Sequence, residues 1–596
     1  MALRTKVGLG LAVIGIALPL LPFVPDYWIT LLNATGLASL VVIGLVLLTG
    51  VGGMTSFGQA AFCGFGAYAT ALLTTQMGLS PWLTLPVAIT VTCSAAAVIG
   101  LLSVRLSGHY LPLGTLAWGI SLYYLFGNLE VLGRHDGIPT VPPLSIGPWE
   151  LYGDRTVYFI IWGLVLLAAV ATLNLLDSRV GRALRALRGG VVAAEAFGVN
   201  TRRAKLVIFV YAALLAAVSG WAFAHIQRAV NPTPFGLNAG IEYLFMAVIG
   251  GVGHVWGAIV GAAAVVLLED RLQIILPALF GHSGNYETII FGCILVLLLQ
   301  FARGGLWGLA LRTMPWLEPP AQASARPATE TEAPPLPRRT APQRGTPLLD
   351  VQGLQKTFGG LTAVKDVSFE VAAGEIVGLI GPNGAGKSTT FNLISGILPP
   401  SAGSIHFNGR DISGLHPRDI ARQGMARSFQ HVKLLPEMTA LENVMLGAHL
   451  RGAAGMVAAI TRRDREEERR LRAEAERALI RCGLKDYMHV KAGTLPLGQS
   501  RIVEIARALC LDPLLILLDE PAAGLRHGEK QALATLLDGL RDDGVAVLLV
   551  EHDMDFVMNL VDRLVVMDFG AKIAEGSPDV VHTNPQVLEA YLGGIE

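Results

Sequence analysis

Long apolar segments follow one another through residues 1–312 of the chain. They lie at residues 7–24, 29–49, 57–75, 82–104, 110–128, 157–176, 206–226, 241–268 and 286–301. Because hydrocarbon offers the backbone no hydrogen-bond partner, segments of this length are expected to cross a membrane as helices. Hydrophobic residues make up 52% of the chain and charged residues only 15%, which is too apolar for a wholly soluble protein.

The first of these segments resembles a signal peptide, since Arg4 and Lys6 precede it. No good cleavage site follows, and further apolar segments do, so we interpret it as a first membrane helix. The loop at 177–205 is strongly basic, whereas the loop at 130–155 is mixed in sign. Basic loops stay on the cytoplasmic side, which places the loop at 177–205 in the cytoplasm and the other loop outside.

Beyond the apolar half, residues 319–347 are dense in Pro, Ala, Thr, Arg and Glu and lack apolar periodicity. Such a segment buries no core and is expected to be disordered or extended. Alternating β-branched runs and helical patterns follow it, as in an α/β domain. We therefore predict a multi-domain chain in which two normally separate proteins are joined end to end. A polytopic α-helical membrane domain occupies residues 1–312, a Pro-rich disordered linker residues 313–347, and an α/β P-loop domain residues 348–596.

A glycine-rich stretch stands between an apolar run at 375–380 and an apolar-periodic segment at 391–397. Its sequence is Gly381-Pro382-Asn383-Gly384-Ala385-Gly386-Lys387-Ser388-Thr389. A turn of this kind between strand and helix cradles phosphate, because backbone N–H groups converge on the anion at the positive end of the helix. Lys387 is expected to reach the β- and γ-phosphates, and Ser388 to bind Mg²⁺. A chance match is the alternative, and the strand-loop-helix setting argues against it.

Two more apolar strands end in polar side chains. Residues 514–518 run into Asp519 and Glu520, and residues 546–550 run into Glu551-His552-Asp553. Asp519 is placed to hold the Mg²⁺ shell, directly or through water, and Glu520 to polarise an attacking water. Each strand alone is common in α/β folds. Their order after a phosphate loop indicates a nucleotide hydrolase.

A cytoplasmic nucleotide site requires the segment at 241–268 to be broken, because one simple crossing would leave the C-terminal half outside. Gly250-Gly251-Val252-Gly253-His254 is the expected break. The result is eight full passes plus a re-entrant hairpin, or ten passes if both arms cross. A polar solute path and close packing through small residues both explain such a break. Polar residues of the segments are candidates for that path or for interfacial anchors: Ser56, Gln59, His109, His225, Gln227, Asn238, Glu242 and His254.

Residues 348–596 resemble the ATPases of ABC transporters over essentially their whole length. Phe358 matches the aromatic residue that stacks on adenine, Gly381 to Thr389 the Walker A loop, and Gln430 in Arg-Ser-Phe-Gln the Q-loop glutamine. Leu495-Pro496-Leu497-Gly498-Gln499 occupies the signature position, while Asp519 and Glu520 match the Walker B pair and His552 the switch histidine. The resemblance implies catalytic roles for Glu520, His552 and Gln430, and ATP and Mg²⁺ as cofactors. It implies nucleotide contacts from Phe358, Gly381, Asn383, Gly384, Gly386, Lys387, Ser388, Thr389, Gly498 and Gln499, and Mg²⁺ contacts from Ser388, Gln430 and Asp519.

Finer motifs resemble the importers of branched-chain amino acids. In the second half these are Leu-Asp-Glu-Pro-Ala-Ala-Gly-Leu at 518–525, the charged insertion at 461–479 and the ending at 584–593. In the first half, residues 58–68, 179–183 and 250–254 are similar to the permease of the same importers. Residues 192–197 predict a short amphipathic helix ended by Gly198. Glu195, Ala196 and Gly198 loosely match the coupling segment of importer permeases, and a basic membrane-surface helix is the alternative.

Two positions depart from the family pattern. Pro496-Leu497 stands where the signature usually has Ser-Gly, so a hydroxyl is missing; Pro at a first helical position is well tolerated. Arg526 stands where the D-loop usually has Asn or Asp. These changes indicate unequal ATP sites, or else neutral drift in an active ATPase.

The sequence thus predicts an ABC importer subunit, permease fused to ATPase, in a bacterial inner membrane. The resemblance implies an external solute-binding protein, together with a second permease and ATPase or a second copy of this chain. Branched-chain amino acids lead as substrate, with urea, short amides and other small carboxylates as alternatives. A membrane-anchored ATPase for lipid or lipopolysaccharide extraction and a non-hydrolysing regulatory ATPase are rivals. The formal net charge of +0 gives no reason to propose nucleic acid as a partner.

Overall fold

The computed structural model describes residues 15, 18–104, 106, 108, 110–151, 153–280, 286–301, 304–314 and 333–592. The chain divides into two compact units. The first comprises Met1–Asp177 and Arg202–Pro320, and the second comprises Ser178–Thr201 and Ala321–Glu596. Most of the predicted segment at 7–24, His109 and residues 315–332 of the predicted linker lie outside the described residues.

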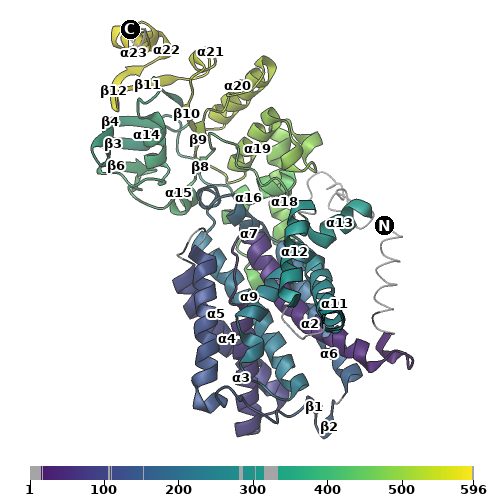
Figure 1. Cartoon of the computed structure of the whole chain (residues 1–596). Coiled ribbons are helices and arrows are strands. Elements are labelled where there is room, and N and C mark those ends of the chain that lie inside the picture. Colours follow the sequence, from purple (N-terminus) through teal and green to yellow (C-terminus); the bar gives the residue numbers. More distant parts are fainter. Residues whose placement is uncertain are drawn as a thin grey trace. The chain divides into compact units, whose positions relative to one another are not determined.

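The first unit is built from long helices (Figure 1). They are α2 (Asp26–Leu45), which continues into the π-helix η2 (Val46–Val51), α3 (Gln59–Met77), α4 (Pro81–Ser103), α5 (Tyr110–Asn128), α6 (Asp154–Leu176), α9 (Thr201–Gln227), α10 (Leu237–Gly250), α11 (Val255–Phe280), α12 (Tyr286–Phe301) and α13 (Gly305–Thr313). A small hairpin of β1 (Ser145–Ile146) and β2 (Trp149–Glu150) precedes α6. Each apolar segment predicted between residues 29 and 301 therefore coincides with a helix or, at 241–268, with two.

Four helical stretches of the described residues are long and apolar enough to cross a membrane. They are Asp26–Val51, Pro81–Ser103, Asp154–Leu176 and Thr201–Gln227, and the bent pair of α10 and α11 adds a fifth if it forms one span. Asp26–Val51 and α9 are mostly buried within the unit, whereas α4 and α6 expose most of their length. An apolar helix that exposes its length is suited to lipid contact. The total of eight or ten passes stays a prediction.

The predicted break at Gly250–His254 is present. α10 ends at Gly250, α11 begins at Val255, and the two helices are bent by 119°. The arms pack backbone against backbone: a Cβ on Gly250 would lie 1.9 Å from the Gly257 carbonyl oxygen, and one on Gly261 would lie 1.9 Å from the Met246 carbonyl oxygen. Close packing through small residues, one of the two expected causes of the break, accounts for these glycines.

The second unit contains two sheets. A six-stranded sheet has the order β12-β11-β5-β10-β9-β8, and a four-stranded antiparallel sheet has the order β4-β3-β6-β7. The strands are β3 (Pro347–Phe358), β4 (Leu361–Ala372), β5 (Ile376–Ile380), β6 (Ala402–Phe407), β7 (Arg410–Asp411), β8 (Met425–Arg427), β9 (Leu515–Asp519), β10 (Ala546–Val550), β11 (Arg563–Asp568) and β12 (Ala571–Gly576). In the larger sheet every pairing is parallel except that of β11 with β12.

Helices cover the larger sheet on both faces. Along β5, Val377 and Leu379 enter one apolar core while Ile376 and Ile380 enter another, as the two-residue period of a strand requires. This explains why the buried strands were readable as short, continuous apolar runs. The helices of the second unit are α7 (Arg179–Gly189), α8 (Val191–Ala196), α14 (Lys387–Ile394), α15 (Pro417–Gln423), α16 (Ala440–Gly447), α17 (Met456–Ile460), α18 (Arg465–Arg481), α19 (Leu497–Leu509), α20 (His527–Asp542), α21 (Met554–Met558), α22 (Pro578–His582) and α23 (Pro585–Leu592).

The described end of the linker, residues 333–346, forms no helix or strand but is held in place. Leu336 is buried in the apolar cluster of α16, α18 and α19. The backbone N–H of Arg339 donates to Asp512 (2.6 Å), and its guanidinium donates to the Arg422 carbonyl (2.7 Å). Of the two alternatives predicted for the linker, these residues take the extended one, and the disordered linker at 313–347 stays a prediction.

Candidate functional site

The predicted phosphate loop connects the carboxyl end of β5 to the start of α14. Gly381, Gly384 and Gly386 have φ angles of 148°, 85° and 97°, which only glycine adopts readily. A Cβ on Gly381 would lie 2.1 Å from the Met567 carbonyl oxygen, so the loop could not pass β11 with a larger residue. At Gly384 a Cβ would meet nothing within 4 Å, which leaves this side of the loop open to a ligand.

Lys387 is the first residue of α14, and its ammonium group turns back into the loop. The Nζ atom donates to the Gly381 carbonyl (2.6 Å) and to the Pro382 carbonyl (2.9 Å). Burial lowers the pKa of Lys387, while the nearby carboxylates of Glu520 and Asp519 act in the opposite direction. An open glycine cradle, a helix N-terminus and a lysine that reaches into the loop fit a bound triphosphate. Helix α14 ends at Ile394, three residues before the end of the predicted segment at 391–397, because Gly396 turns the chain with a φ of 73°.

Asp519 lies at the end of β9, within the parallel sheet that carries the loop. Its backbone N–H donates to the Ser428 hydroxyl (3.1 Å), and its carboxylate lies 3.6 Å from the Arg427 guanidinium. Burial raises the pKa of Asp519, and Arg427 opposes this. Burial also lowers the pKa of Arg427 to about 10. Arg427 and Ser428 precede the predicted Gln430, but the sequence did not indicate that they support Asp519.

Glu520 follows Asp519 in the left-handed region, with φ 50°, and its N–H donates to the Val550 carbonyl of β10 (2.8 Å). One carboxylate oxygen accepts a hydrogen bond from Gln430 Nε2 (3.2 Å), and the other lies 3.9 Å from His552 Nδ1. The structure thus brings together the three residues predicted to be catalytic, from three different segments.

Glu551, between β10 and His552, was missed as a supporting residue. Its buried carboxylate accepts hydrogen bonds from the backbone N–H groups of Ala522 (2.6 Å) and His552 (3.1 Å). Burial raises its pKa, which these backbone donors partly offset. Glu551 therefore fixes the backbone on both sides of the site while the His552 side chain stays 65% exposed. Its only signal in the sequence was a carboxylate at the end of a buried strand.

The remaining predicted nucleotide contacts are less enclosed. Phe358 ends β3 with 45% of its surface exposed, and Lys356 Nζ lies 5.2 Å from the centre of its ring. Asn383 and Ser388 are exposed, and Thr389 is half-buried at the start of α14. The ring of Phe358 and the hydroxyl of Ser388 are therefore both accessible to a ligand.

The signature segment begins α19, which starts at Leu497. Pro496 is the residue before the helix rather than its first residue, so the predicted position is wrong by one. Leu497 is 55% exposed, and a Cβ on Gly498 would lie 2.6 Å from a carboxylate oxygen of Glu529 in α20. The Oε1 atom of Gln499 is buried without a hydrogen-bond partner among the described residues.

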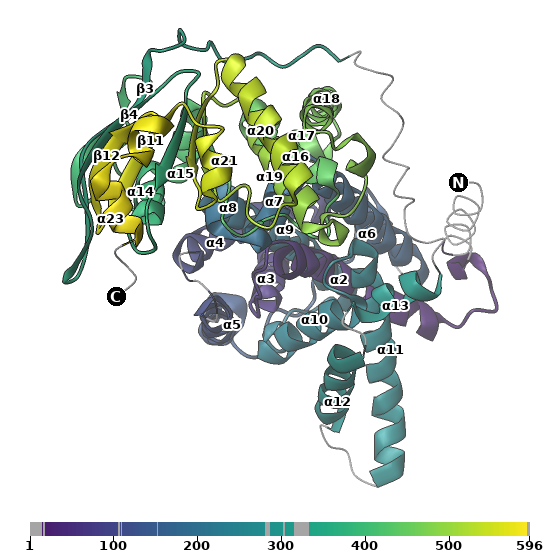
Figure 2. The ribbon, with the colours of Figure 1, turned by 90° about the horizontal axis from the view of Figure 1, so that it is seen from above.

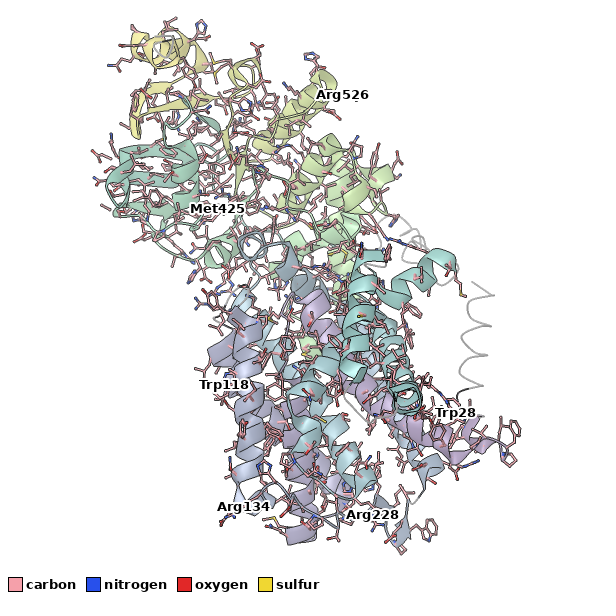
Figure 3. All side chains as sticks on the ribbon, viewed as in Figure 1. Trp28, Trp118, Arg134, Arg228, Met425 and Arg526 are labelled. Atoms are coloured by element: carbon pink, nitrogen blue, oxygen red, sulfur yellow. The ribbon has the colours of Figure 1, made fainter. Side chains whose placement is uncertain are left out.

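Arg526, labelled in Figure 3, is the residue before α20. Its backbone N–H donates to the Glu529 carboxylate (2.9 Å), and the side chain is exposed. Glu529 thus contacts both unusual segments, the signature and the D-loop.

The predicted coupling segment forms two helices, α7 and α8, and belongs to the same compact unit as the ATPase fold. Helix α8 covers Val191–Ala196, close to the predicted 192–197, and Gly198 ends it with φ 82°. A Cβ on Gly198 would lie 2.3 Å from the Leu450 side chain, which explains the glycine. Apolar contact joins Ala183, Ala186, Ala194 and Val199 of this segment to Leu435, Met438 and Leu446.

Charged residues also hold α7 against the insertion helix α18. Arg182 donates to both carboxylate oxygens of Glu468 (2.8 and 3.1 Å), and both side chains are nearly buried. Arg179 donates to the carbonyls of His449 and Ala454 (2.7 Å each). Burial, reinforced by Arg179 and Arg182, lowers the pKa of His449 to about 3, so its imidazole stays neutral.

A second buried arginine contacts the end of the coupling segment. The guanidinium carbon of Arg507 lies 4.4 Å from the centre of the Phe197 ring, a cation–π arrangement. Arg507 also donates to Glu504 (3.0 Å) and to the Lys433 carbonyl (2.8 Å). Lys433 is close in sequence to Gln430, so this contact connects the coupling segment to the segment that carries the Q-loop glutamine.

Family models match the chain in sequence order. A permease component of branched-chain amino acid transport systems matches residues 27–299, the ABC transporter model matches residues 364–523, and a branched-chain amino acid ATP-binding cassette transporter model matches residues 571–596. Together they cover the apolar half, the phosphate loop and the C-terminal end.

Individual proteins match the second half. The high-affinity branched-chain amino acid transport ATP-binding protein BraF of Pseudomonas aeruginosa is 43% identical over 250 residues, which are 41% of this chain and 98% of BraF. LivG of Escherichia coli, which has the same description, is 42% identical over 252 residues, again 41% of this chain and 98% of LivG. A solved nucleotide-free ATP-binding cassette from an ABC transporter is 33% identical, with 41% of this chain and 99% of that chain covered and a TM-score of 0.37.

The fold and the site define an ATP hydrolase coupled to transport, with a membrane-embedded permease segment and a cytoplasmic ATP-binding domain in one polypeptide. The chain belongs to the family of branched-chain amino acid ABC transporters.

Proposed function

We propose that the chain imports branched-chain amino acids across a bacterial inner membrane by ATP hydrolysis. The observation that carries the proposal is that the coupling helices α7 and α8 pack into the same unit as the phosphate loop and its Gln430, Glu520 and His552 cluster. The coupling helices α7 and α8 lie between α6 and α9 in the sequence. A movement of the ATPase fold is therefore transmitted along the polypeptide to α6 and to α9.

The chemistry of the site assigns a role to each residue. ATP with Mg²⁺ supplies the phosphoryl group that water attacks. Lys387 and the N–H groups of the glycine loop bind the phosphates, Phe358 offers a face for adenine, and the signature residues Gly498 and Gln499 serve the site of a partner domain. Ser388, Gln430 and Asp519 would hold Mg²⁺, because their side chains offer the oxygen ligands that this ion prefers. Glu520 accepts the proton of the attacking water, and His552 holds this carboxylate from its other side.

We infer the partners from the resemblance to ABC transporter ATPases, in which each ATP lies between the phosphate loop of one domain and the signature of another. Either a second permease and ATPase or a second copy of this chain would complete two shared ATP sites, and an external solute-binding protein would deliver the amino acid. Pro496, Leu497 and Arg526 belong to the surface offered to the partner, so the two ATP sites of such an assembly need not be equal.

Ligand binding by the proposed solute-binding partner, sought among the genes beside that of this chain, tests the substrate. We expect leucine-class amino acids to bind and to be taken up by vesicles that contain the assembled transporter. Binding of urea, short amides or other small carboxylates in their place would redirect the proposal within the same machinery. Uptake of no solute, with lipid extraction instead, would overturn it.

Gln59 offers a test of the substrate path. It is 1% exposed at the start of α3, and neither atom of its amide group has a hydrogen-bond partner among the described residues. A buried unpaired amide costs free energy, so Gln59→Leu should leave thermal stability unchanged or raised. If the amide serves a passing solute, uptake should fall about tenfold while ATP binding is kept, since a lost hydrogen bond to a charged group costs about 1.5 kcal/mol or more. Unchanged uptake would assign Gln59 to packing alone.

A further inference from the structure

One arginine beside the site contacts both the phosphate-loop helix α14 and the strand that ends in Asp519. Arg427 is the last residue of β8, which pairs in parallel with β9 so that Arg427 stands opposite Leu517. Leu517 and Asp519 are two positions apart on β9 and face the same side of the sheet. The Nη2 atom of Arg427 lies 3.6 Å from Asp519 Oδ2, and each of the two side chains is only 7% exposed. The ion pair is therefore shielded from solvent.

Helix α14 covers the same side of the sheet. Phe391 and Ile394 of α14 belong to one apolar core with Leu517 of β9. The end of the helix lies against α15 (Figure 2), since a Cβ on Gly396 would be 2.7 Å from Ile420 Cδ1. Helix α15 leads directly into β8, which brings the end of α14 within reach of Arg427.

The guanidinium of Arg427 also holds the end of α14. Its Nη1 atom donates to the Ser395 hydroxyl and to the Phe391 carbonyl (3.4 Å). Its carbon lies 5.0 Å from the centre of the Phe391 ring and 5.5 Å from that of Phe429, and both rings are at cation–π distance. The Nε atom donates to the Ser428 carbonyl (3.3 Å). One planar fork thus contacts α14 through Nη1 and Asp519 through Nη2.

These contacts set the spacing of two proposed Mg²⁺ ligands, Ser388 and Asp519. Ser388 lies in the first turn of α14, seven positions before Ser395, and the helix connects the two serines as one short rigid body. A shift of α14 along β9 would move Ser388 away from Asp519 and would break the contacts of Arg427 at the same time. Mg²⁺ requires near-ideal octahedral geometry at about 2.0–2.1 Å, so a small change in this spacing weakens its binding.

We propose that Arg427 is a positioning residue for the Mg²⁺ site, which keeps Ser388 and Asp519 at the spacing that one ion requires. Stability alone does not call for an arginine, because a buried ion pair adds little over apolar side chains of similar volume. A methionine would still pack against the two phenylalanine rings but would leave Asp519 and Ser395 without their shared contact. The inference deepens the proposed function and rests on the loop being an ATP site.

Arg427→Met in the full-length chain, assembled with its partners, tests the inference. The Kd for a non-hydrolysable ATP analogue is measured with Mg²⁺ and again in EDTA, and the ratio of the two constants gives the contribution of the ion. We expect the Kd with Mg²⁺ to rise about tenfold, the size of a lost interaction with a charged group. The Kd in EDTA should stay within about twofold, because Lys387 and the glycine loop are untouched.

Two further variants sharpen the test. Arg427→Lys keeps the charge but not the planar fork, so it should recover only part of the lost Mg²⁺ effect and leave about a threefold deficit. This variant carries the test if Arg427→Met does not fold. Arg451→Met is the matched control, since Arg451 and Glu474 form another nearly buried pair, 3.0 Å apart, with side chains 8% and 12% exposed. It should leave both Kd values unchanged.

An unchanged Mg²⁺ effect in Arg427→Met would overturn the inference, and so would an equal loss of affinity with and without Mg²⁺. Full recovery by Arg427→Lys would assign the effect to charge alone and would overturn the positioning role as well. A wild-type chain that binds no analogue, or binds it equally well without Mg²⁺, would instead overturn the proposed ATP and Mg²⁺ site.

Discussion

Glu520→Gln should abolish ATP hydrolysis while ATP binding is retained. The amide cannot accept a proton from water, and loss of a general base costs about 10² to 10⁴ in rate. We expect little disturbance of the fold, because a glutamine side chain at position 520 can still contact Gln430 and His552. The rate of hydrolysis and the Kd for ATP, measured on the purified assembly, give the two readouts. Uptake should be lost with hydrolysis.

Glu370→Gln is the matched control, because Glu370 is exposed on β4 in the smaller sheet. This variant should keep the wild-type rate. If Glu520→Gln hydrolyses ATP at that rate as well, Glu520 is not the base. The nearby carboxylate of Asp519 would then need to be tested in its place.

Gln430 and His552 should have smaller and distinguishable effects. Gln430 donates to one oxygen of Glu520, and His552 lies near the other. Removing either leaves the carboxylate in place, so a residual rate well above that of Glu520→Gln is expected. This difference in hydrolysis rate follows from the placement of Gln430 and His552 on opposite sides of the Glu520 carboxylate, which the sequence alone does not show.

The parallel strands of the ATPase domain could be predicted because their side chains are buried on both faces. β5, β9 and β10 appear in the sequence as short apolar runs, and each ends in the residues of the site. Parallel neighbours share one carboxyl edge, so predicting the strands also predicted that the polar residues after them meet. Gly381, Glu520 and His552 were found in this way.

Long-range contacts of α7 could not be predicted. Arg182 and Glu468 are 286 positions apart, and each stands in a helix with many other charges. A charged helix usually faces solvent, so neither residue carried a signal of burial. The end of α14 and the start of α19 were misplaced by one to three residues, because helix ends depend on turns and caps that compete closely.

Arg182→Glu should uncouple transport from ATP hydrolysis. Arg182 is 7% and Glu468 is 11% exposed in their side chains, and the variant would bury two like charges in place of an ion pair. Breaking a buried pair costs about 3–5 kcal/mol, which exceeds what surface pairs contribute. The cost falls on the docking of α7 against α18, and the glycine loop is left intact. We expect uptake to fall more than tenfold while ATP binding is unchanged.

The exchanged pair, Arg182→Glu with Glu468→Arg, distinguishes a direct interaction from general damage. If the two side chains act on each other, the double variant should recover a large part of the uptake that either single variant loses. Recovery will be incomplete, because Glu468 also accepts the backbone N–H of Arg179 and an arginine cannot do so. Arg134→Glu is the control, since the Arg134 and Glu130 pair is more than 60% exposed and contributes little. Wild-type uptake in Arg182→Glu, or a double variant no better than the sum of the singles, would show that this ion pair does not transmit ATPase movement. The movement would then have to be transmitted by the apolar contacts of α8.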